Sequence, residues 1–186
     1  MALNRVAGWV EADGEIRRED GKYFSVIGVN VTIENREVLN WDQPMIKPAQ
    51  EGLIAFIVRP IRGSYHFLVQ AKLEAGNFDI VELAPTVQCL TGNYRTGRNE
   101  YSVKYIDDVL NAPAERILFD AMQSEEGGRF FHEQNRNMIV EVGEDFPLEV
   151  GENYCWMTLH QMLRFIEFNN YLNIAARSLV AAITFD

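Results

Sequence analysis

The amino-acid sequence predicts an α+β fold, in which a mixed, largely antiparallel sheet is followed by C-terminal helices. Between residues 23 and 142, apolar residues alternate with polar ones or form short continuous runs, a pattern typical of strands. After residue 151, apolar residues recur at helical spacing instead. A run of strands that precedes the helices favours helices packed on a sheet.

The length and composition predict a single globular domain over residues 1–186. A chain of 186 residues, 47% of them hydrophobic, can bury one substantial core. The net charge of -10 and the pI near 4.8 argue against nonspecific binding to nucleic acid or to an anionic membrane. No signal peptide or membrane-spanning stretch is visible. With Cys89 and Cys155 interpreted as reduced, buried thiols, we expect a soluble, cytoplasmic protein.

The first third of the chain is expected to contain one turn and one clear strand. Asp13-Gly14 marks the turn, and residues 23–34 are rich in aromatic and β-branched residues, with Gly28 as a candidate bulge. Residues 36–48 are too polar and too rich in proline for a central strand. Pro44 favours an extended conformation at Gln43.

The middle of the chain predicts a hairpin and further strands. Residues 52–60 form an apolar run typical of a buried strand, and the turn at 62–64 joins it to an alternating strand at 66–74. Residues 80–88 are expected to be extended, 91–98 to form a polar loop and 105–111 a short helical turn. The expected strands at 116–123 and 129–134 are joined by a glycine turn, and a tight turn at 135–137 leads into a strand at 138–142. Helices are expected at 156–168 and 174–185.

The strand at 66–74 carries an unusual set of polar side chains on one face. His66, Gln70, Lys72 and Glu74 share this face by the two-residue period of a strand, and Leu68 interrupts them. Such a row can line a pocket for a polar ligand. An antiparallel strand with one solvated face explains the alternation as well, so both interpretations stand at this point.

Familiar cofactor motifs are absent from the sequence. It has no glycine-rich phosphate loop, no nucleophile elbow and no His-Glu-x-x-His pair. The three histidines, His66, His132 and His160, are too few and too scattered for a multi-histidine metal site, so we expect no metal. Several basic residues of the middle region could instead gather around an anion such as a diphosphate: Arg59, Lys72, Arg95, Arg98, Arg129 and Arg136.

Several segments resemble, in order, the NDP-hexose 2,3-dehydratase family of deoxysugar biosynthesis. The resemblance lies in residues 36–44, 66–72 (His-Phe-Leu-Val-Gln-Ala-Lys), 82–88 with Asn93-Tyr94, 123–131, 135–137, 156–161 and 176–178. Members of that family usually contain two such repeats, each with a Nudix-like α/β fold, and work as dimers. This chain resembles one repeat, and it lacks the Nudix box, so the fold implies no metal-dependent hydrolysis.

The resemblance implies a nucleotide-linked 4-keto-6-deoxyhexose as substrate, typically with thymidine diphosphate. The C4 ketone acidifies the C3 proton, so a base can remove that proton and the C2 hydroxyl can leave with help from an acid. Because the ketone accepts the electrons, no cofactor is expected. The expected partners are the nucleotide-diphosphate sugar and, since the chain resembles one repeat, a second copy in a homodimer.

Residue types suggest roles within this chemistry. Lys72 or Tyr94 could polarise the ketone, and Lys72 could also act as the base. Glu74, Glu141 or Glu125 is the carboxylate alternative for proton abstraction. The residues suited to binding substrate are amides, arginines and two ring side chains, with Trp41 able to stack a base: Trp41, Gln43, His66, Gln70, Gln88, Asn93, Gln123, Arg129, Arg136 and Asn137.

Three functions remain open at the level of sequence. The first is a compact 2,3-dehydratase that works as a homo-oligomer. The second is an epimerase or isomerase of the same kind of keto-sugar, because it shares the removal of the proton beside the ketone. The third is a module that binds nucleotide-sugars without turning them over.

Overall fold

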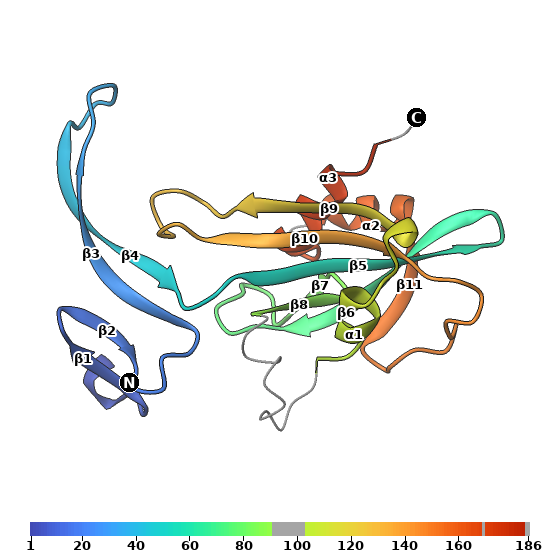
Figure 1. Cartoon of the computed structure of the whole chain (residues 1–186), viewed down its shortest axis with the longest axis horizontal. Coiled ribbons are helices and arrows are strands. Elements are labelled where there is room, and N and C mark those ends of the chain that lie inside the picture. The colour runs from blue at the N-terminus through green and yellow to red at the C-terminus, as the bar shows by residue number, and fades with distance from the viewer. Residues whose placement is uncertain (91–102, 169, 185–186) are drawn as a thin grey trace. The chain divides into compact units, whose positions relative to one another are not determined.

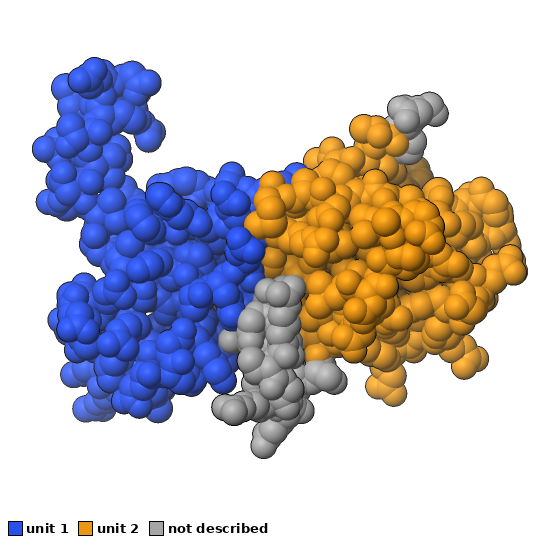
Figure 2. Space-filling model, viewed as in Figure 1, with its two compact units in different colours: residues 1–51, 90–99, 123–135 blue, residues 52–89, 100–122, 136–186 orange. Residues whose placement is uncertain are grey.

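The computed structural model describes residues 1–90, 103–168 and 170–184. The chain divides into two compact units, shown in Figure 2. Unit 1 consists of residues 1–51, 90–99 and 123–135, and unit 2 consists of residues 52–89, 100–122 and 136–186. The single domain expected over residues 1–186 stays a prediction.

Unit 1 contains, within the described residues, a four-stranded antiparallel sheet with the strand order β1-β2-β3-β4. Asp13 and Gly14 have φ values of 56° and 78°, so the predicted turn is confirmed as the tight connection of β1 and β2. The elements are η1 (Leu3–Arg5), β1 (Trp9–Ala12), β2 (Glu15–Arg18), β3 (Phe24–Thr32) and β4 (Asn40–Pro48).

The β3–β4 hairpin confirms one prediction and corrects another. β4 lies at the end of the sheet order, which agrees with the expectation that this proline-containing segment is not a central strand. The register runs without interruption from Phe24 opposite Pro48 to Thr32 opposite Asn40. The bulge predicted at Gly28 is therefore wrong, because Gly28 pairs directly with Pro44.

The second sheet has seven strands within the described residues. Its order is β11-β6-β5-β10-β9, with β7 paired to β6 and β8 paired to β5. The predicted β5–β6 hairpin is confirmed, and its two turn residues, Arg62 and Gly63, have φ values of 51° and 81°. The strands are β5 (Gly52–Ile61), β6 (Ser64–Leu73), β7 (Val81–Ala84), β8 (Val87–Leu90), β9 (Ile117–Ser124), β10 (Gln134–Glu141) and β11 (Tyr154–Thr158).

β5 is buried on both faces, and its alternate residues belong to two hydrophobic clusters. Ile54, Phe56 and Val58 pack in the cluster that includes residues of α2 and α3, whereas Leu53, Ala55 and Ile57 pack in the cluster that includes α1. Helices therefore cover both faces of the sheet in unit 2 (Figure 1). The helices are α1 (Ile106–Leu110), η3 (Ala114–Arg116), α2 (Leu159–Ile166) and α3 (Ile174–Ala181).

Thr86 joins β5 and β6 where their direct pairing ends. The register of β5 and β6 runs from Ile61 opposite Ser64 to Val58 opposite Phe67. Beyond it, the buried Thr86 hydroxyl accepts a hydrogen bond from the Ile57 N–H at 2.9 Å and donates to the Leu68 carbonyl. The segment predicted to be extended over 80–88 is thus divided into β7 and β8, which pair with different strands.

Three local predictions are wrong. The tight turn expected at 135–137 belongs to β10 and directly follows its first residue, Gln134, and Asn135 and Asn137 are buried there and have polar partners. The strand expected at 129–134 is a connection, and β10 begins at Gln134. The helix expected from residue 156 begins at Leu159, because the preceding residues pair with β6 as β11.

The general architecture agrees with the sequence. The short helical turn predicted before Pro113 is confirmed as α1, and the C-terminal helices follow the strands, so the α+β class is confirmed. Both cysteines are free, but neither is buried as expected, because Cys89 is half-buried and Cys155 is exposed. None of the helices in the described ranges has the length and apolar character that a bilayer crossing requires.

Candidate functional site

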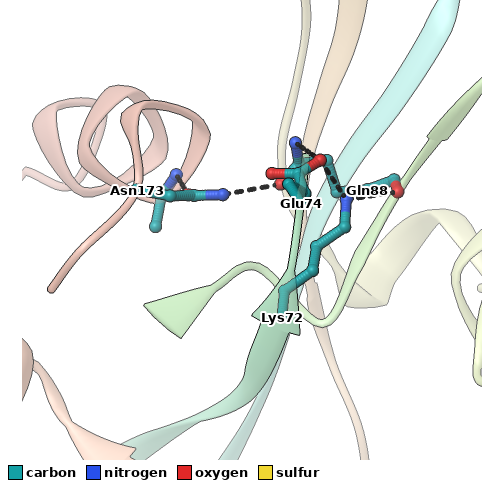
Figure 3. A network of polar contacts seen from close by, with 5 residues as sticks. Lys72, Glu74, Gln88 and Asn173 are labelled. Atoms are coloured by element: carbon teal, nitrogen blue, oxygen red, sulfur yellow. Dashed lines mark hydrogen bonds and ion pairs between the residues drawn. The ribbon is translucent and has the colours of Figure 1, made fainter. Parts of the chain in front are cut away.

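The polar row of β6 ends in a network of side chains in unit 2, shown in Figure 3. The ammonium Nζ of Lys72 lies 2.9 Å from Glu74 Oε1 and donates to the Gln88 main-chain carbonyl at 3.2 Å. The two charged side chains are 20% and 35% exposed. A charge pair at this depth remains accessible to a ligand while being partly shielded from water.

The strands explain why these residues meet. β6 ends at Leu73, and the chain turns at Gly76, which has a φ of 99° that favours glycine. It returns as β7, antiparallel to β6, with Glu82 opposite Lys72. Gln88 follows on β8, and its Nε2 lies 3.4 Å from Glu74 Oε1.

Asn173 completes the network and was missed by the sequence reasoning. Its side-chain Nδ2 donates to Gln88 Oε1 at 2.8 Å, and its Oδ1 accepts the Ala176 N–H at 2.9 Å as the N-cap of α3. An asparagine directly before an apolar helical run is a recognised N-cap signal. That signal identifies the start of the helix, but it does not reveal the contact with Gln88.

Burial and charge around the network affect neighbouring groups. Burial raises the pKa of the Glu82 carboxyl, with further contributions from Asp79 and Glu74, and Arg177 opposes the shift. Burial also raises the pKa of the Cys89 thiol to about 11, although nearby Lys72 acts in the opposite direction. The surroundings of Lys72 are therefore partly dehydrated and contain charges of both signs.

The two remaining predicted residues of β6 differ in their surroundings. Gln70 is half-buried and shares the Lys72 face by strand alternation. The His66 Nδ1 lies 3.0 Å from the Ser64 carbonyl in its own hairpin. Leu68, on the same face of β6, is fully buried. This face is therefore not exposed to water along its whole length.

Glu141 lies elsewhere in unit 2. It accepts a hydrogen bond from the Tyr65 hydroxyl, and this bond raises the pKa of Tyr65. Tyr65 and Lys72 are seven residues apart on one strand, which corresponds to roughly 23 Å. Glu141 also lines an open cavity of about 680 Å³ together with Arg116 and Asp145. The structure therefore does not bring Glu141 to Lys72.

Arg136 and Asn137 belong to β10 and have partners of their own. Arg136 donates to both carboxylate oxygens of Asp120, at 2.9 and 2.6 Å, which lowers the pKa of Asp120 and raises that of Arg136. Asn137 is 2% exposed. Arg59, another of the predicted basic residues, is buried and donates to the carbonyls of Glu144 and Phe146.

Another group of predicted residues meets in unit 1. The Trp41 indole N–H donates to Gln43 Oε1 at 2.5 Å, and Gln43 Nε2 donates to the Gly128 carbonyl. The adjacent Arg129 is 66% exposed on its side chain and lies 3.7 Å from Glu126. Trp41 also lines a shallow cavity of about 370 Å³ with residues 36–38.

The other predicted residues have varied positions. Gln123 lies half-buried near the end of β9, and Glu125 accepts a hydrogen bond from Asn135 at 2.6 Å. Asn93, Tyr94, Arg95 and Arg98 lie outside the described residues. In the part of the chain that the structure describes, no three His, Cys, Asp or Glu side chains are grouped so as to hold a metal ion.

Comparison with solved structures identifies the fold. The chain is similar to a crystal structure of an ADP compounds hydrolase, with a TM-score of 0.52 and 14% sequence identity, over 85% of this chain and 83% of that one. The predicted Nudix-like fold is thereby confirmed. At this low identity the similarity concerns the fold alone.

Comparison with sequences identifies the family. A dTDP-4-dehydro-6-deoxy-alpha-D-glucopyranose 2,3-dehydratase from Streptomyces violaceoruber is 47% identical over 185 residues, and one from Saccharopolyspora spinosa is 46% identical over 183 residues. Both alignments cover 98% of this chain but only 41% and 38% of the relatives, so the chain spans about two fifths of their length. The family model for NDP-hexose 2,3-dehydratase matches residues 1–183. The chain belongs to the NDP-hexose 2,3-dehydratase family.

Proposed function

We propose that this chain acts in the 2,3-dehydration of a dTDP-linked 4-keto-6-deoxyhexose, with Lys72 and Glu74 at the reacting carbons. The names of the relatives support the reaction and the substrate class. The observation that carries the residue assignment is the 2.9 Å contact between Lys72 Nζ and Glu74 Oε1, in which a proton donor lies beside a proton acceptor. In the sugar, the C4 ketone oxygen and the C3 proton are carried by adjacent carbons, so a donor and an acceptor that lie side by side can reach both.

In the proposed reaction, Lys72 donates a hydrogen bond to the C4 ketone oxygen. An ammonium has three donors, and the described residues supply two acceptors for Lys72, Glu74 and the Gln88 carbonyl. A substrate oxygen can take the third donor. A positive donor in a partly dehydrated position stabilises the negative charge that develops on this oxygen as the enolate forms.

Glu74 is the proposed base. Its carboxylate takes the C3 proton, and the electrons of the C3–H bond form the enolate of the C4 ketone. When the carbonyl forms again, the electrons make the C2–C3 double bond and the C2–O bond breaks. The leaving hydroxide takes up the proton that Glu74 removed from C3 and departs as water, which returns Glu74 to its carboxylate form. Because the ketone accepts and returns the electron pair, the reaction balances without an oxidant or a reductant.

Gln70 and Gln88 are proposed to assist this centre, Gln70 by binding a sugar hydroxyl from the face of Lys72 and Gln88 by orienting Glu74. For unit 1 taken by itself, the roles of Trp41 in stacking a nucleobase and of the exposed Arg129 in binding a diphosphate remain predictions.

Solvent exchange tests the proposal. The protein is incubated with the dTDP-linked 4-keto sugar in deuterated water, and the sugar is followed by NMR and mass spectrometry. We expect the C3 hydrogen and the C2 hydroxyl to be lost together, and deuterium at C3 to appear only in substrate that re-forms from the enolate. Lys72→Met and Glu74→Gln should each slow exchange by about 10²- to 10⁴-fold, the usual contribution of a positioned acid or base.

The matched control is Lys47→Met, because Lys47 is an exposed lysine with a distant 3.9 Å contact to Glu15. This variant should exchange the C3 hydrogen of the sugar at the wild-type rate. Exchange at C3 without loss of the hydroxyl would replace the dehydratase by an epimerase or isomerase, and saturable binding without exchange would replace it by a binding module. Wild-type exchange in Lys72→Met would remove Lys72 from the reaction.

We also infer that the chain forms a homodimer. The support is a group of exposed apolar side chains beside and at the start of α3, Phe168, Tyr171 and Ile174, which are 54%, 47% and 66% exposed. Ile174→Asp should give a monomer in light scattering, since aspartate is well tolerated in the first turn of a helix. Leu39→Asp, at another exposed apolar residue, is the control. An unchanged mass for Ile174→Asp would exclude this surface.

A further inference from the structure

We infer that Asn173 is a positioning residue that orients Glu74 and Lys72 through the side-chain amide of Gln88. Asn173 is 3% exposed and lies at the N-terminus of α3. The residues on which it acts are those of the proposed reaction, so its catalytic consequence rests on the proposed function. The hydrogen-bond chain from Asn173 to Glu74 and Lys72 does not depend on the proposed function.

The direction of the chain is set by the backbone of α3. The Ala176 N–H can only donate, so the Asn173 side chain must turn its oxygen toward it, at 2.9 Å. The Asn173 amino group then faces Gln88, where it donates to Oε1 at 2.8 Å. If the Asn173 side-chain amide rotated by 180°, it would lose its hydrogen bond from Ala176 and would place its Oδ1 against Gln88 Oε1.

The orientation of Asn173 determines that of Gln88. Because Gln88 Oε1 faces Asn173, Gln88 Nε2 must point the other way, where Glu74 Oε1 lies at 3.4 Å. A carboxylate only accepts hydrogen bonds, so the chain ends in a matching partner. The same Glu74 oxygen contacts Lys72 at 2.9 Å, as Figure 3 shows.

The position of Asn173 is itself fixed by its backbone. Its N–H donates to the Leu83 carbonyl of β7 at 2.9 Å, and its carbonyl accepts the Arg177 N–H at 3.0 Å. Leu83 also pairs with Leu172 in an isolated parallel bridge. The residue is thus held to the strand that runs beside Lys72, so its side chain is a rigid reference point for the amide of Gln88.

Asn173→Ser separates this role from the capping of α3. Serine is as good an N-cap as asparagine, so α3 keeps its first hydrogen bond. Its short hydroxyl cannot serve Ala176 and also reach Gln88, so the Gln88 amide is free to rotate. Gln88→Met breaks the same chain without touching the helix and keeps the length of the side chain.

The substrate-free measurement is the exchange of the Lys72 ammonium protons with water, followed by ¹H–¹⁵N NMR. In the wild type, hydrogen bonds from Asn173 through Gln88 and Glu74 hold the Lys72 ammonium. We expect its protons to exchange about fivefold faster in Asn173→Ser, the factor that corresponds to the loss of one hydrogen bond. Gln88→Met should show a similar increase. The double variant should exchange no faster than Gln88→Met alone, because Asn173 acts through Gln88.

Unchanged ammonium exchange in Asn173→Ser, or effects of the two substitutions that add, would overturn the inference. The melting temperature of Asn173→Ser should stay close to that of the wild type, and Asn173→Ala, which loses the cap as well, should melt lower. In the sugar assay, Asn173→Ser should lower kcat for C3 exchange about fivefold with little change in KM. A wild-type protein without C3 exchange would refute the proposed function, and the NMR result would still decide the role of Asn173.

Discussion

Thr86 illustrates how much a single hydroxyl can contribute to this fold. It satisfies the N–H of Ile57 and the carbonyl of Leu68 at a buried position where β5 and β6 no longer pair directly. Without it, two main-chain groups of different strands would be buried and unpaired. The sequence contains a threonine in a Pro-Thr-Val run, and nothing local indicates this bridging role.

Thr86→Val should therefore lower the free energy of unfolding by about 3 kcal/mol, since valine has the same shape but leaves a donor and an acceptor unsatisfied. Thr86→Ser keeps the hydroxyl and should cost about 1 kcal/mol for the lost methyl group. Urea unfolding curves with unchanged slopes measure both. Equal losses for the two variants would contradict the bridging role.

The sequence pattern selects some residues of the proposed site and does not indicate others, for a physical reason. Strand alternation alone selects Lys72 and Glu74, because Lys72 lies on β6 and Glu74 directly follows its last residue, Leu73, two positions further on. The contact of Asn173 with Gln88 joins positions 85 residues apart, and no local pattern encodes such a distance. Glu141 was grouped with Lys72 by residue type alone, and the strand geometry separates them.

The β9–β10 pair shows the same limit at the scale of an element. Residues 135–137 have the composition of a turn, yet they belong to β10 and directly follow its first residue, Gln134. Asn135 binds Glu125, and Arg136 binds Asp120 with two hydrogen bonds. Partners supplied by the fold therefore override the local preference of asparagine, whereas strands with a strong apolar pattern, such as β5, are predicted correctly.

The Asp120–Arg136 pair should make stability depend on pH. Arg136 lowers the pKa of Asp120 below its ordinary 3.8, so the folded protein binds protons less readily than the unfolded chain. The contribution of the pair is complete above pH 3.8 and is lost as the pH falls through the folded-state pKa. Solvent screening limits it to about 1 kcal/mol, because both side chains are more than a third exposed.

Comparison of the wild type with Asp120→Asn measures this contribution. The difference in unfolding free energy between them should be largest near neutral pH and should shrink in acid, where the wild-type carboxyl is protonated as well. Chemical denaturation at a series of pH values gives the difference directly. A difference that grows as the pH falls would contradict the assigned direction.

At the scale of the whole molecule, the α+β class follows from hydrophobic periodicity, but the assignment of strands to sheets does not. The pattern of residues 23–34 identifies β3, yet nothing in it determines that β3 joins β4 in one sheet while β5 joins another. Sheet membership depends on pairing between distant segments. The apolar pattern predicts that two helices follow the strands, because each helix buries one apolar side against the adjacent sheet, but it does not give their bounds: α2 begins at Leu159 rather than 156, and α3 ends at Ala181 rather than 185.

The two-sided burial of β5 has a thermodynamic consequence for unit 2. Consecutive residues of this strand pack in the two hydrophobic clusters on opposite faces of the sheet. If the strand detached, both clusters would lose packing contacts together. Neither layer of helices can lose its support while the other keeps its own. We therefore expect unit 2 to unfold in a single cooperative transition, without a partly folded intermediate in which only one of the two clusters remains packed.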